Sequence, residues 1–218
     1  MSEQKPVLYG YFRSSASYRV RIVLEIKGIE YDQKIVNLLK KEQLSEEYKK
    51  VVPTQKVPAF VTKEGRLILQ SQAIVDYLDD VYPGPSLYPK DPLDRAYVRE
   101  ICQIIACDIH PLQNLGVLQR VAPDNQEEQN AFAREMITKA FHGLEARLAK
   151  VASKYSFGDT LTMADVFVVP MVYNAMRRDV DMSQFPILSR LYDTVSALPE
   201  FKRASPPAQP DCPPELKQ

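Results

Sequence analysis

Three serines stand in the segment Arg13-Ser14-Ser15-Ala16-Ser17, directly after the first apolar run of the chain. The residues that follow have helical periodicity, so these serines lie where a helix is expected to begin. The N-terminus of a helix offers unpaired N–H groups and a partial positive charge, which stabilise an anion such as a thiolate. Serines in this place are also common as plain helix caps. The segment alone therefore fits both an anion site and an ordinary cap.

Two further segments stand at expected connections between elements. Lys56-Val57-Pro58 opens a strand-like run, and a cis bond at Pro58 would turn the Val57 N–H and C=O groups towards an extended peptide ligand. A trans bond, the common form, would give them no such role. Gln70-Ser71 precedes a helical run, where a hydroxyl, backbone N–H groups and the helix dipole could bind a carboxylate. A plain cap at Ser71 is the alternative.

The elements that must position these residues follow from hydrophobic periodicity. Their order is β-α-β-α-β-β-α, which predicts an α/β domain with a hairpin around Gly65. Gly28 is expected to end the first helix. The expected elements are the strands 7–11, 31–36, 57–61 and 66–69, the helices 14–27 and 71–81, and a weakly helical stretch 42–50.

A proline-rich segment separates this domain from the rest of the chain. Pro83-Gly84-Pro85-Ser86-Leu87-Tyr88-Pro89 holds three prolines and a glycine, a composition typical of a domain boundary. We therefore expect a first domain over residues 1–82, a linker over 83–91 and a second domain over 92–218.

The second domain has helical periodicity throughout. Thr162 and Asp165 are placed as the N-cap and third residue of a capping box, and Pro170 is expected to kink that helix or mark a turn. A last helix is expected over 187–198, and the tail from Ala204 is expected to have no regular structure. The apolar positions that recur at helix spacing are Val98, Ile101 and Ile105, and Ile137, Phe141, Leu144, Leu148 and Val151.

The charges and the composition exclude several classes of protein. Lys plus Arg and Asp plus Glu both count 28, so the net charge is zero and no basic surface for nucleic acid is expected. No run approaches the roughly 18 apolar residues of a membrane span, and residues 1–6 lack the apolar core of a secretory signal. Three cysteines without C-x-x-C spacing and two histidines predict neither disulfides nor a metal site. We expect a soluble, cytoplasmic protein with no membrane partner.

The cysteines are expected to have no catalytic role. Cys102 and Cys107 stand five positions apart in an apolar helix and are expected to be buried as small hydrophobic residues. Cys212 lies in the tail, which is expected to be flexible. Because no cysteine precedes Cys102, a thiol transferase with a cysteine nucleophile is disfavoured.

Taken together, these motifs resemble the glutathione transferases, and within them the zeta class, the maleylacetoacetate isomerases. The phrase Arg13-Ser14-Ser15-Ala16-Ser17-Tyr18-Arg19-Val20-Arg21-Ile22 is similar to the signature of that class. Gln70-Ser71 followed by Ala73-Ile74 resembles its site for the γ-glutamyl group of glutathione. The resemblance covers nearly the whole chain, and the other matching segments are 111–115, 158–159, 162–165 and 209–211.

The resemblance implies a fold, an assembly and a cofactor. The fold is an α/β thioredoxin-like N-terminal domain with an all-α C-terminal domain, and Val57-Pro58 is implied to be a cis-proline loop. A homodimer is implied, with the N-terminal domain of one chain against the helical domain of the other. Glutathione is the implied cofactor, and the implied substrate is a small electrophile that bears carboxylates. The implied cofactor residues are Ser14, Ser15, Ala16, Gln43, Val57, Gln70, Ser71, His110 and Asn114, and the implied substrate residues are Arg13 and Arg177.

The implied mechanism uses a serine as a hydrogen-bond donor and not as a nucleophile. A free thiol is mostly protonated at neutral pH, and a hydroxyl donor together with the helix dipole favours the thiolate. Ser14 is the first choice for this donor and Ser15 the second. The thiolate adds to the cis double bond of a maleyl substrate, the bond rotates, and glutathione leaves from the trans product. Arg177 is either a partner for a substrate carboxylate or a solvated charge at a helix end.

The chain departs from the class at three positions. Ala16 stands where the class normally has a cysteine, and Lys56 and His110 stand where glutamine is frequent. Three functions therefore stay open. They are isomerisation of maleylacetoacetate to fumarylacetoacetate in tyrosine and phenylalanine catabolism, conjugation or dehalogenation of small electrophiles such as haloacids, and a non-catalytic binding module of the same fold.

Overall fold

The computed structural model describes residues 4–217, which form two compact units. The N-terminal unit runs to Pro85 and also includes the chain from Pro199 onward, whereas the helical unit is Ser86–Leu198. The first boundary falls in the proline-rich segment that the sequence indicated. The second boundary differs from the sequence-based division, which assigned residues 199–218 to the helical domain.

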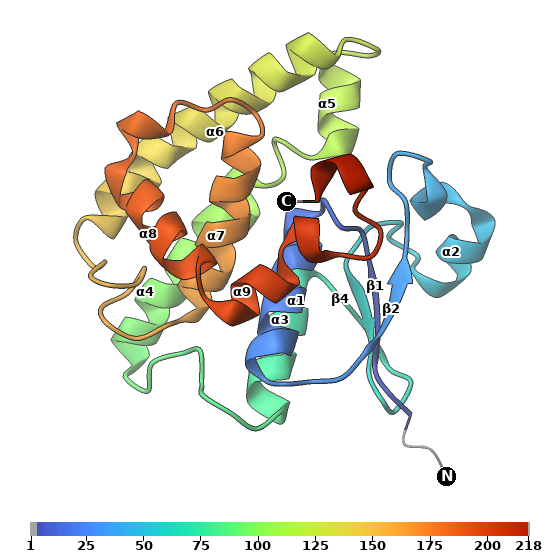
Figure 1. Cartoon of the computed structure of the whole chain (residues 1–218), viewed down its shortest axis with the longest axis horizontal. Coiled ribbons are helices and arrows are strands. Elements are labelled where there is room, and N and C mark those ends of the chain that lie inside the picture. The colour runs from blue at the N-terminus through green and yellow to red at the C-terminus, as the bar shows by residue number, and fades with distance from the viewer. Residues whose placement is uncertain (1–3, 218) are drawn as a thin grey trace. The chain divides into compact units, whose positions relative to one another are not determined.

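A four-stranded sheet forms the centre of the N-terminal unit (Figure 1). Its strand order is β2-β1-β3-β4, with β1 parallel to β2 and antiparallel to β3, and with β3 antiparallel to β4. Leu8 pairs with Gln33 on one side and with Phe60 on the other. The strands are β1 (Val7–Gly10), β2 (Asp32–Ile35), β3 (Ala59–Val61) and β4 (Leu67–Leu69), each shorter by one or two residues than expected.

Helices cover both faces of this sheet. In Figure 1, α1 (Ser15–Ile26) and α3 (Ser71–Val81) lie together on one side of the sheet, and α2 (Glu46–Val51) lies on the other. The short 3-10 helix η1 (Glu42–Leu44) precedes α2. This arrangement is the thioredoxin-like fold that the resemblance implied. The fully buried side chains include Leu8, Val20, Ile22, Val23, Leu24, Phe60, Ile74, Val75 and Leu78.

The two ends of α1 follow from local chemistry. Ser14 is the N-cap, and its Oγ accepts a hydrogen bond from the N–H of Ser17. Gly28 has a φ of +63° directly after the helix, a conformation that glycine adopts without steric cost. Its N–H donates to the carbonyl of Glu25, which satisfies one of the last free carbonyls of the helix.

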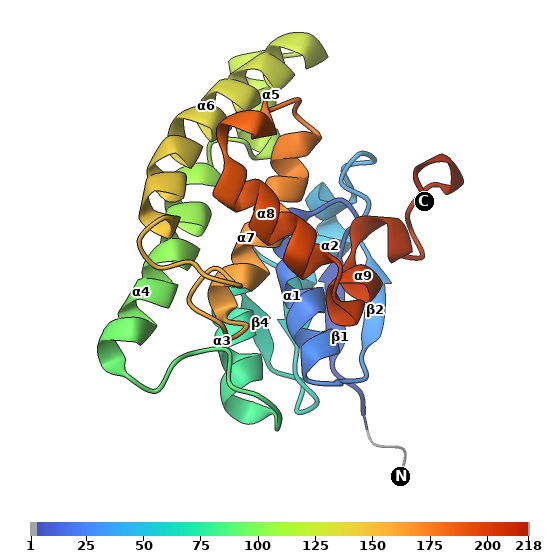
Figure 2. The same ribbon diagram turned by 60° about the vertical axis from the view of Figure 1, so that its left-hand side comes forward.

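The C-terminal tail is ordered, which corrects the expectation of a flexible segment. After α9 (Pro199–Ala204), the chain forms the 3-10 helices η4 (Pro206–Ala208) and η5 (Pro214–Leu216). Helix α9 packs against α1, and the tail continues beside the N-terminal unit in both Figure 1 and Figure 2. Cys212 is buried there against Tyr11 and Phe12. The sequence could not show this order, because prolines remove local hydrogen bonds but do not prevent distant contacts.

The helical unit is built around α7 (Met163–Met176), which is apolar on nearly all sides and almost entirely buried. It packs against α4 (Pro92–Gln103) and α8 (Pro186–Ser196). The helix runs through Pro170 without ending, so of the kink or turn expected at this proline, the turn is absent. The remaining elements are the π-helical segment η2 (Ile104–Ile109), α5 (Leu115–Val121), α6 (Gln126–Leu148) and the 3-10 helix η3 (Met182–Gln184).

The two cysteines of this unit have different surroundings. Cys102 is buried as expected, but Cys107 is exposed, and its Sγ donates to Oε1 of Gln103. Cys102 lies in α4, whereas Cys107 lies in the π-helical segment η2, so the α-helical spacing assumed from the sequence does not relate their two faces. The expectation that both are buried was therefore wrong for Cys107.

The capping box of α7 is confirmed, and its carboxylate is buried. Oδ2 of Asp165 accepts hydrogen bonds from the N–H and the hydroxyl of Thr162, and Oδ1 accepts from the N–H of Ser156 at 2.8 Å. Burial raises the pKa of the Asp165 carboxyl, and these hydrogen bonds act in the opposite direction. The side chain therefore joins the start of α7 to the preceding loop.

Replacing Asp165 by Ala should lower the free energy of unfolding by about 3 kcal/mol, because it leaves two buried N–H groups without their acceptor. Urea denaturation followed by circular dichroism measures this loss. Asp91 is the matched control, since it caps α4 through the N–H groups of Leu93 and Asp94 but lies at the surface. Asp91→Ala should cost about 1 kcal/mol. Equal losses in the two variants would contradict the importance of burial at Asp165.

Candidate functional site

The N-terminus of α1 has the features of an anion site. The first turn of this helix contains no acidic residue, and Ser15 and Ala16 are buried within it. Ser14 is half-buried, and its Oγ accepts from the N–H of Ser17 at 3.1 Å. A hydroxyl that accepts a hydrogen bond can still donate its own proton. Ser14 can therefore cap the helix and act as a donor at the same time.

The N-terminus of α3 is linked to α1 by a buried arginine. Nη1 of Arg19, a residue that is only 1% exposed, donates to Oγ of Ser71 at 3.2 Å. The hydroxyl proton of Ser71 is then left to donate elsewhere. The first turn of α3 also has no acidic residue. Two helix N-termini and one buried cation thus belong to the same part of the N-terminal unit, an arrangement suited to anionic groups.

Gln70 has a backbone conformation that is rare for a residue with a side chain. Its φ is +71° and its ψ is 122°, and it occupies the N-cap position of α3 without a capping hydrogen bond from its side chain. Ser71 is the first residue of the helix and not its cap, in contrast to the plain cap considered from the sequence. Such strained conformations are frequent at binding sites. The amide of Gln70 is exposed and available to a ligand.

The peptide bond between Val57 and Pro58 is cis. Tyr48 lies beneath this loop, and its hydroxyl donates to the carbonyl of Lys56 at 2.8 Å. Burial raises the pKa of the Tyr48 hydroxyl, so this donor stays protonated. Val57 is half-buried, and it packs against the buried cluster of Val36, Tyr48, Val52 and Ala59. The loop is thus held from both its backbone and its side chains.

Two further candidates of the N-terminal unit, Gln43 and Arg13, are half-buried. Gln43 is half-buried in η1, and within the described residues its buried Oε1 has no hydrogen-bond partner. The guanidinium of Arg13 lies over the ring of Phe12, 5.2 Å from its centroid. Both residues therefore keep polar groups that a ligand could use.

The candidates of the helical unit belong to a chain of polar side chains. Arg177 ends α7, and its Nη1 donates to Oδ1 of Asn174 at 3.1 Å. Nδ2 of the buried Asn174 donates in turn to Oε1 of the buried Gln113. The guanidinium of Arg177 is thus hydrogen-bonded to a buried amide at the end of α7. His110 follows η2, and Oδ1 of Asn114 caps α5 through the N–H of Gly116.

Sequence reasoning missed several residues that support these groups. They are Arg19, Arg21, Tyr48, Gln113 and Asn174. Two arginines in the apolar stretch of α1 were a usable signal, because a charged residue is rarely buried unless it is paired. The roles of Tyr48 and Asn174 had no such signal, since both depend on partners brought close by folding.

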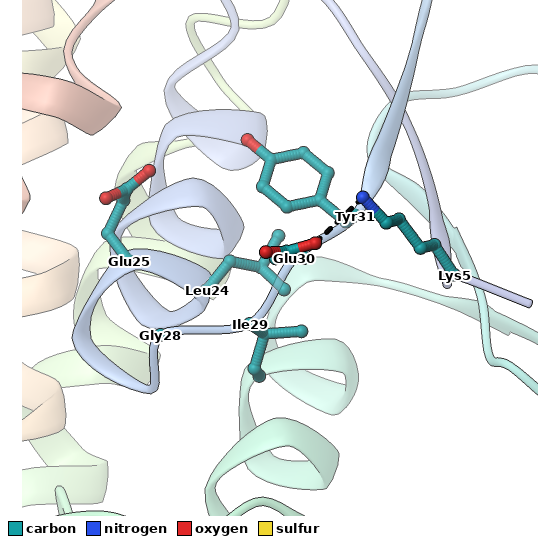
Figure 3. Close-up of a pocket in the computed structure, with 7 residues that line it drawn as sticks. All are labelled: Lys5, Leu24, Glu25, Gly28, Ile29, Glu30 and Tyr31. Carbon is teal, nitrogen blue, oxygen red and sulfur yellow. Dashed lines mark ion pairs between the residues drawn. The ribbon is translucent and has the colours of Figure 1, made fainter. Parts of the chain in front are cut away.

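Figure 3 shows a separate groove of about 500 Å³ at the other end of α1. An ion pair of 2.8 Å between Nζ of Lys5 and Oε2 of Glu30 lies along it. None of the candidate residues above lines this groove. Its lining residues are Lys5, Leu24, Glu25, Gly28, Ile29, Glu30 and Tyr31.

Residues 4–217 offer neither a metal centre nor a membrane span. This part of the chain contains no group of three or more His, Cys, Asp or Glu side chains placed to hold a metal ion. Among its helices, none combines the length and the apolar character that crossing a membrane requires.

The chain is similar to known proteins over its whole length. The family model described as glutathione S-transferase, N-terminal domain, matches residues 6–80, and the model for the C-terminal domain matches residues 114–203. The maleylacetoacetate isomerase of Mus musculus is 45% identical over 219 residues, which cover 100% of both chains. This chain therefore belongs to the glutathione S-transferase family, in the zeta class that includes the maleylacetoacetate isomerases.

Solved structures agree with this assignment. A maleylpyruvate isomerase, a bacterial glutathione S-transferase of the zeta class, has a TM-score of 0.90 and 37% identity, and the match covers 95% of this chain and 100% of that chain. The maleylacetoacetate isomerase of Anaeromyxobacter dehalogenans has a TM-score of 0.86 and 34% identity, with 96% and 98% covered. That structure contains dicarboxyethyl glutathione and citrate in its active site.

Proposed function

We propose that this chain catalyses the glutathione-dependent cis–trans isomerisation of maleylacetoacetate to fumarylacetoacetate, a step of tyrosine and phenylalanine catabolism. The observation that carries the proposal is the hydrogen bond from Arg19 to Ser71, which links the second turn of α1 to the first residue of α3 through a buried cation. Relatives that match the whole chain are maleylacetoacetate isomerases, and one solved neighbour holds a glutathione derivative that carries an added dicarboxyethyl group.

The groups of the N-terminal unit fit glutathione. Its γ-glutamyl carboxylate suits the Ser71 hydroxyl, the exposed amide of Gln70 and the N–H groups at the start of α3. Its peptide backbone suits the N–H and C=O groups of Val57, which the loop below Pro58 holds in place. The unpaired Oε1 of Gln43 can accept a further hydrogen bond. The first turns of α1 and α3 contain no acidic residue that would repel an anion.

The N-terminus of α1 stabilises a negative charge on sulfur. Bound glutathione supplies a thiolate that adds reversibly to the cis double bond and so permits its rotation. We assign the hydrogen bond to sulfur to Ser14, because its Oγ already accepts from Ser17 and its proton is left to donate. Ser15 is the second choice, because it is buried within the first turn. The helix dipole adds to either donor.

The carboxylates of the substrate require cationic partners. Arg177 suits this role, because Asn174 holds its guanidinium in a fixed direction. Arg13 is a second candidate, since its guanidinium rests on Phe12 and is only half-buried. Carboxylate ligands in a homologous active site support this assignment.

Ala16 favours a second candidate function, the conjugation or dehalogenation of small electrophiles such as haloacids. The class normally has a cysteine at this position, so the surface next to the bound sulfur differs in this chain. A non-catalytic binding module is less well supported, because the relatives that match the whole chain are enzymes of the zeta class. A homodimer and a cytoplasmic location remain predictions from the resemblance and from cysteine usage.

Replacing Ser71 by Ala should weaken glutathione binding by about 1.5–3 kcal/mol, because one hydrogen bond to a charged group is lost. Isothermal titration calorimetry measures the change. The control is an analogue of glutathione in which the γ-glutamyl carboxylate is replaced by an amide. Its binding affinity should fall less than that of glutathione when Ser71 is replaced by Ala. An unchanged affinity for glutathione in Ser71→Ala would remove Ser71 from the site.

Replacing Ser14 by Ala should raise the pKa of the bound thiol and lower turnover by roughly 100-fold or more, with a smaller effect on binding. Thiolate absorbance followed against pH measures the pKa directly. Ser45→Ala is the matched control, because Ser45 caps α2 through the N–H of Tyr48 in the same way. Both variants should lose about 1 kcal/mol of stability, but only Ser14→Ala should change the thiol. A large effect of Ser15→Ala in place of Ser14→Ala would exchange the two roles.

The wild-type chain should isomerise maleylacetone in a glutathione-dependent assay, because glutathione and not a protein cysteine supplies the thiolate. Ala16→Cys should change turnover only modestly but should introduce inactivation by alkylating electrophiles, since it places a thiol in the site. Mass spectrometry of residue 16 detects the alkylation, and a haloacid assayed beside maleylacetone separates the two candidate functions. An inactive wild type together with a strongly active Ala16→Cys would favour conjugation or dehalogenation.

A further inference from the structure

We propose that the ordered C-terminal tail, residues 205–212, is a positioning element for the thiol-binding turn at residues 11–14, and that Asp211 is its principal positioning residue. This inference rests on the proposed function, because it assigns the tail to the same glutathione site. It does not place the tail in contact with glutathione or substrate.

Asp211 fixes the backbone of the turn that carries Ser14. Oδ2 of Asp211 accepts a hydrogen bond of 2.9 Å from the N–H of Phe12, across 199 positions of sequence. Phe12 lies inside a turn closed by the N–H of Ser14 and the carbonyl of Tyr11 at 3.0 Å. Any movement of the Phe12 peptide group therefore moves the N-cap of α1 and the hydroxyl of Ser14.

Arg21 fixes the other side of the same turn. Its guanidinium is fully buried, and Nη2 donates to the carbonyl of Phe12 at 3.1 Å while Nε donates to the carbonyl of Ala204 at 2.8 Å. Asp211 of the C-terminal segment thus holds the N–H of Phe12. Arg21, which also binds the carbonyl of Ala204, holds the C=O of Phe12. A backbone held at both groups cannot rotate without breaking one of these hydrogen bonds.

Cys212 connects the tail to the second part of the glutathione site. It is buried with Tyr11 and Phe12, and this cluster packs against Leu38 and Val57. Val57 is the residue assigned to the peptide backbone of glutathione. The tail thus supports both the turn at the sulfur end and the loop that holds the peptide.

Hydrogen bonds within the C-terminal segment and to α1 hold the tail in place. Gln209 is buried, and its Nε2 donates to the carbonyls of Arg203 and Ser205 at 3.1 and 3.0 Å. The carbonyl of Gln209 accepts from the N–H of Cys212. Upstream, the hydroxyl of Tyr18 in α1 donates to the carbonyl of Phe201 at 3.0 Å. The segment is therefore anchored on both sides of η4 before it reaches Phe12.

The test uses the full-length protein with substitutions at Asp211. Asp211→Ala should lower kcat roughly 10- to 100-fold, because a small displacement of a catalytic donor has effects of this size. It should raise the pKa of the bound glutathione thiol towards that of free glutathione. The glutathione Kd should change less, by a factor below about three, because Asp211 lies outside the proposed binding contacts. Asp211→Asn keeps an oxygen acceptor for the Phe12 N–H and should restore most of the loss.

Two truncations provide a matched comparison. Removing residues 214–218 leaves Asp211 and Cys212 in place and should leave kcat and the thiol pKa unchanged. Removing residues 210–218 deletes both and should reproduce Asp211→Ala with a larger rise in Kd, because the buried cluster against which Val57 packs loses Cys212. If Asp211→Ala does not fold, Asp211→Glu replaces it, since its longer side chain displaces the carboxylate and should shift the thiol pKa in the same direction.

The outcomes separate this inference from the proposed function. A wild-type chain that does not lower the pKa of the glutathione thiol contradicts the proposed function. The positioning role is overturned if the wild-type chain and the Asp211→Ala variant lower the pKa of the glutathione thiol equally. A loss of thermal stability in Asp211→Ala with unchanged thiol pKa and kcat also overturns it, because a merely structural contact would give that result.

Discussion

The N-terminal unit depends on two buried guanidinium groups that project from α1. A buried charge is costly unless hydrogen bonds satisfy it, so Arg19 and Arg21 require acceptors at fixed places. Arg21 finds carbonyls at Tyr11, Phe12 and Ala204, and Arg19 donates to the hydroxyl of Ser71. The first turn, the start of α3 and the end of α9 are thereby drawn to one helix. These contacts define where the candidate site forms.

The site that results is made of helix ends and backbone groups, and it needs no general base within the N-terminal unit. Partial positive charge at the starts of α1 and α3 favours a thiolate at one end of glutathione and a carboxylate at the other. The same principle explains why neither first turn carries an acidic residue. In the proposed mechanism Ser14 has two roles, because one hydroxyl can accept from the helix and donate to sulfur.

The helical unit contributes a different kind of organisation. Gln113 and Asn174 are buried amides, and their hydrogen bonds lead to the guanidinium of Arg177. Asp165 secures the start of the same helix, α7, that ends at Arg177. A fixed cation suits a substrate with carboxylates, which agrees with the ligands of a homologous active site.

The sequence by itself determined the order of elements, the caps at Ser14 and Thr162, and the resemblance that led to Gln70 and Ser71. These features depend on periodicity and on residues a few positions apart, so local chemistry specifies them. Only the tertiary structure decided the place of the tail, the exposure of Cys107 and the acceptors of Arg19 and Arg21. The bond between Phe12 and Asp211 spans 199 positions. No local pattern encodes such a contact, because it exists only after the sheet and helices bring the two ends of the chain together.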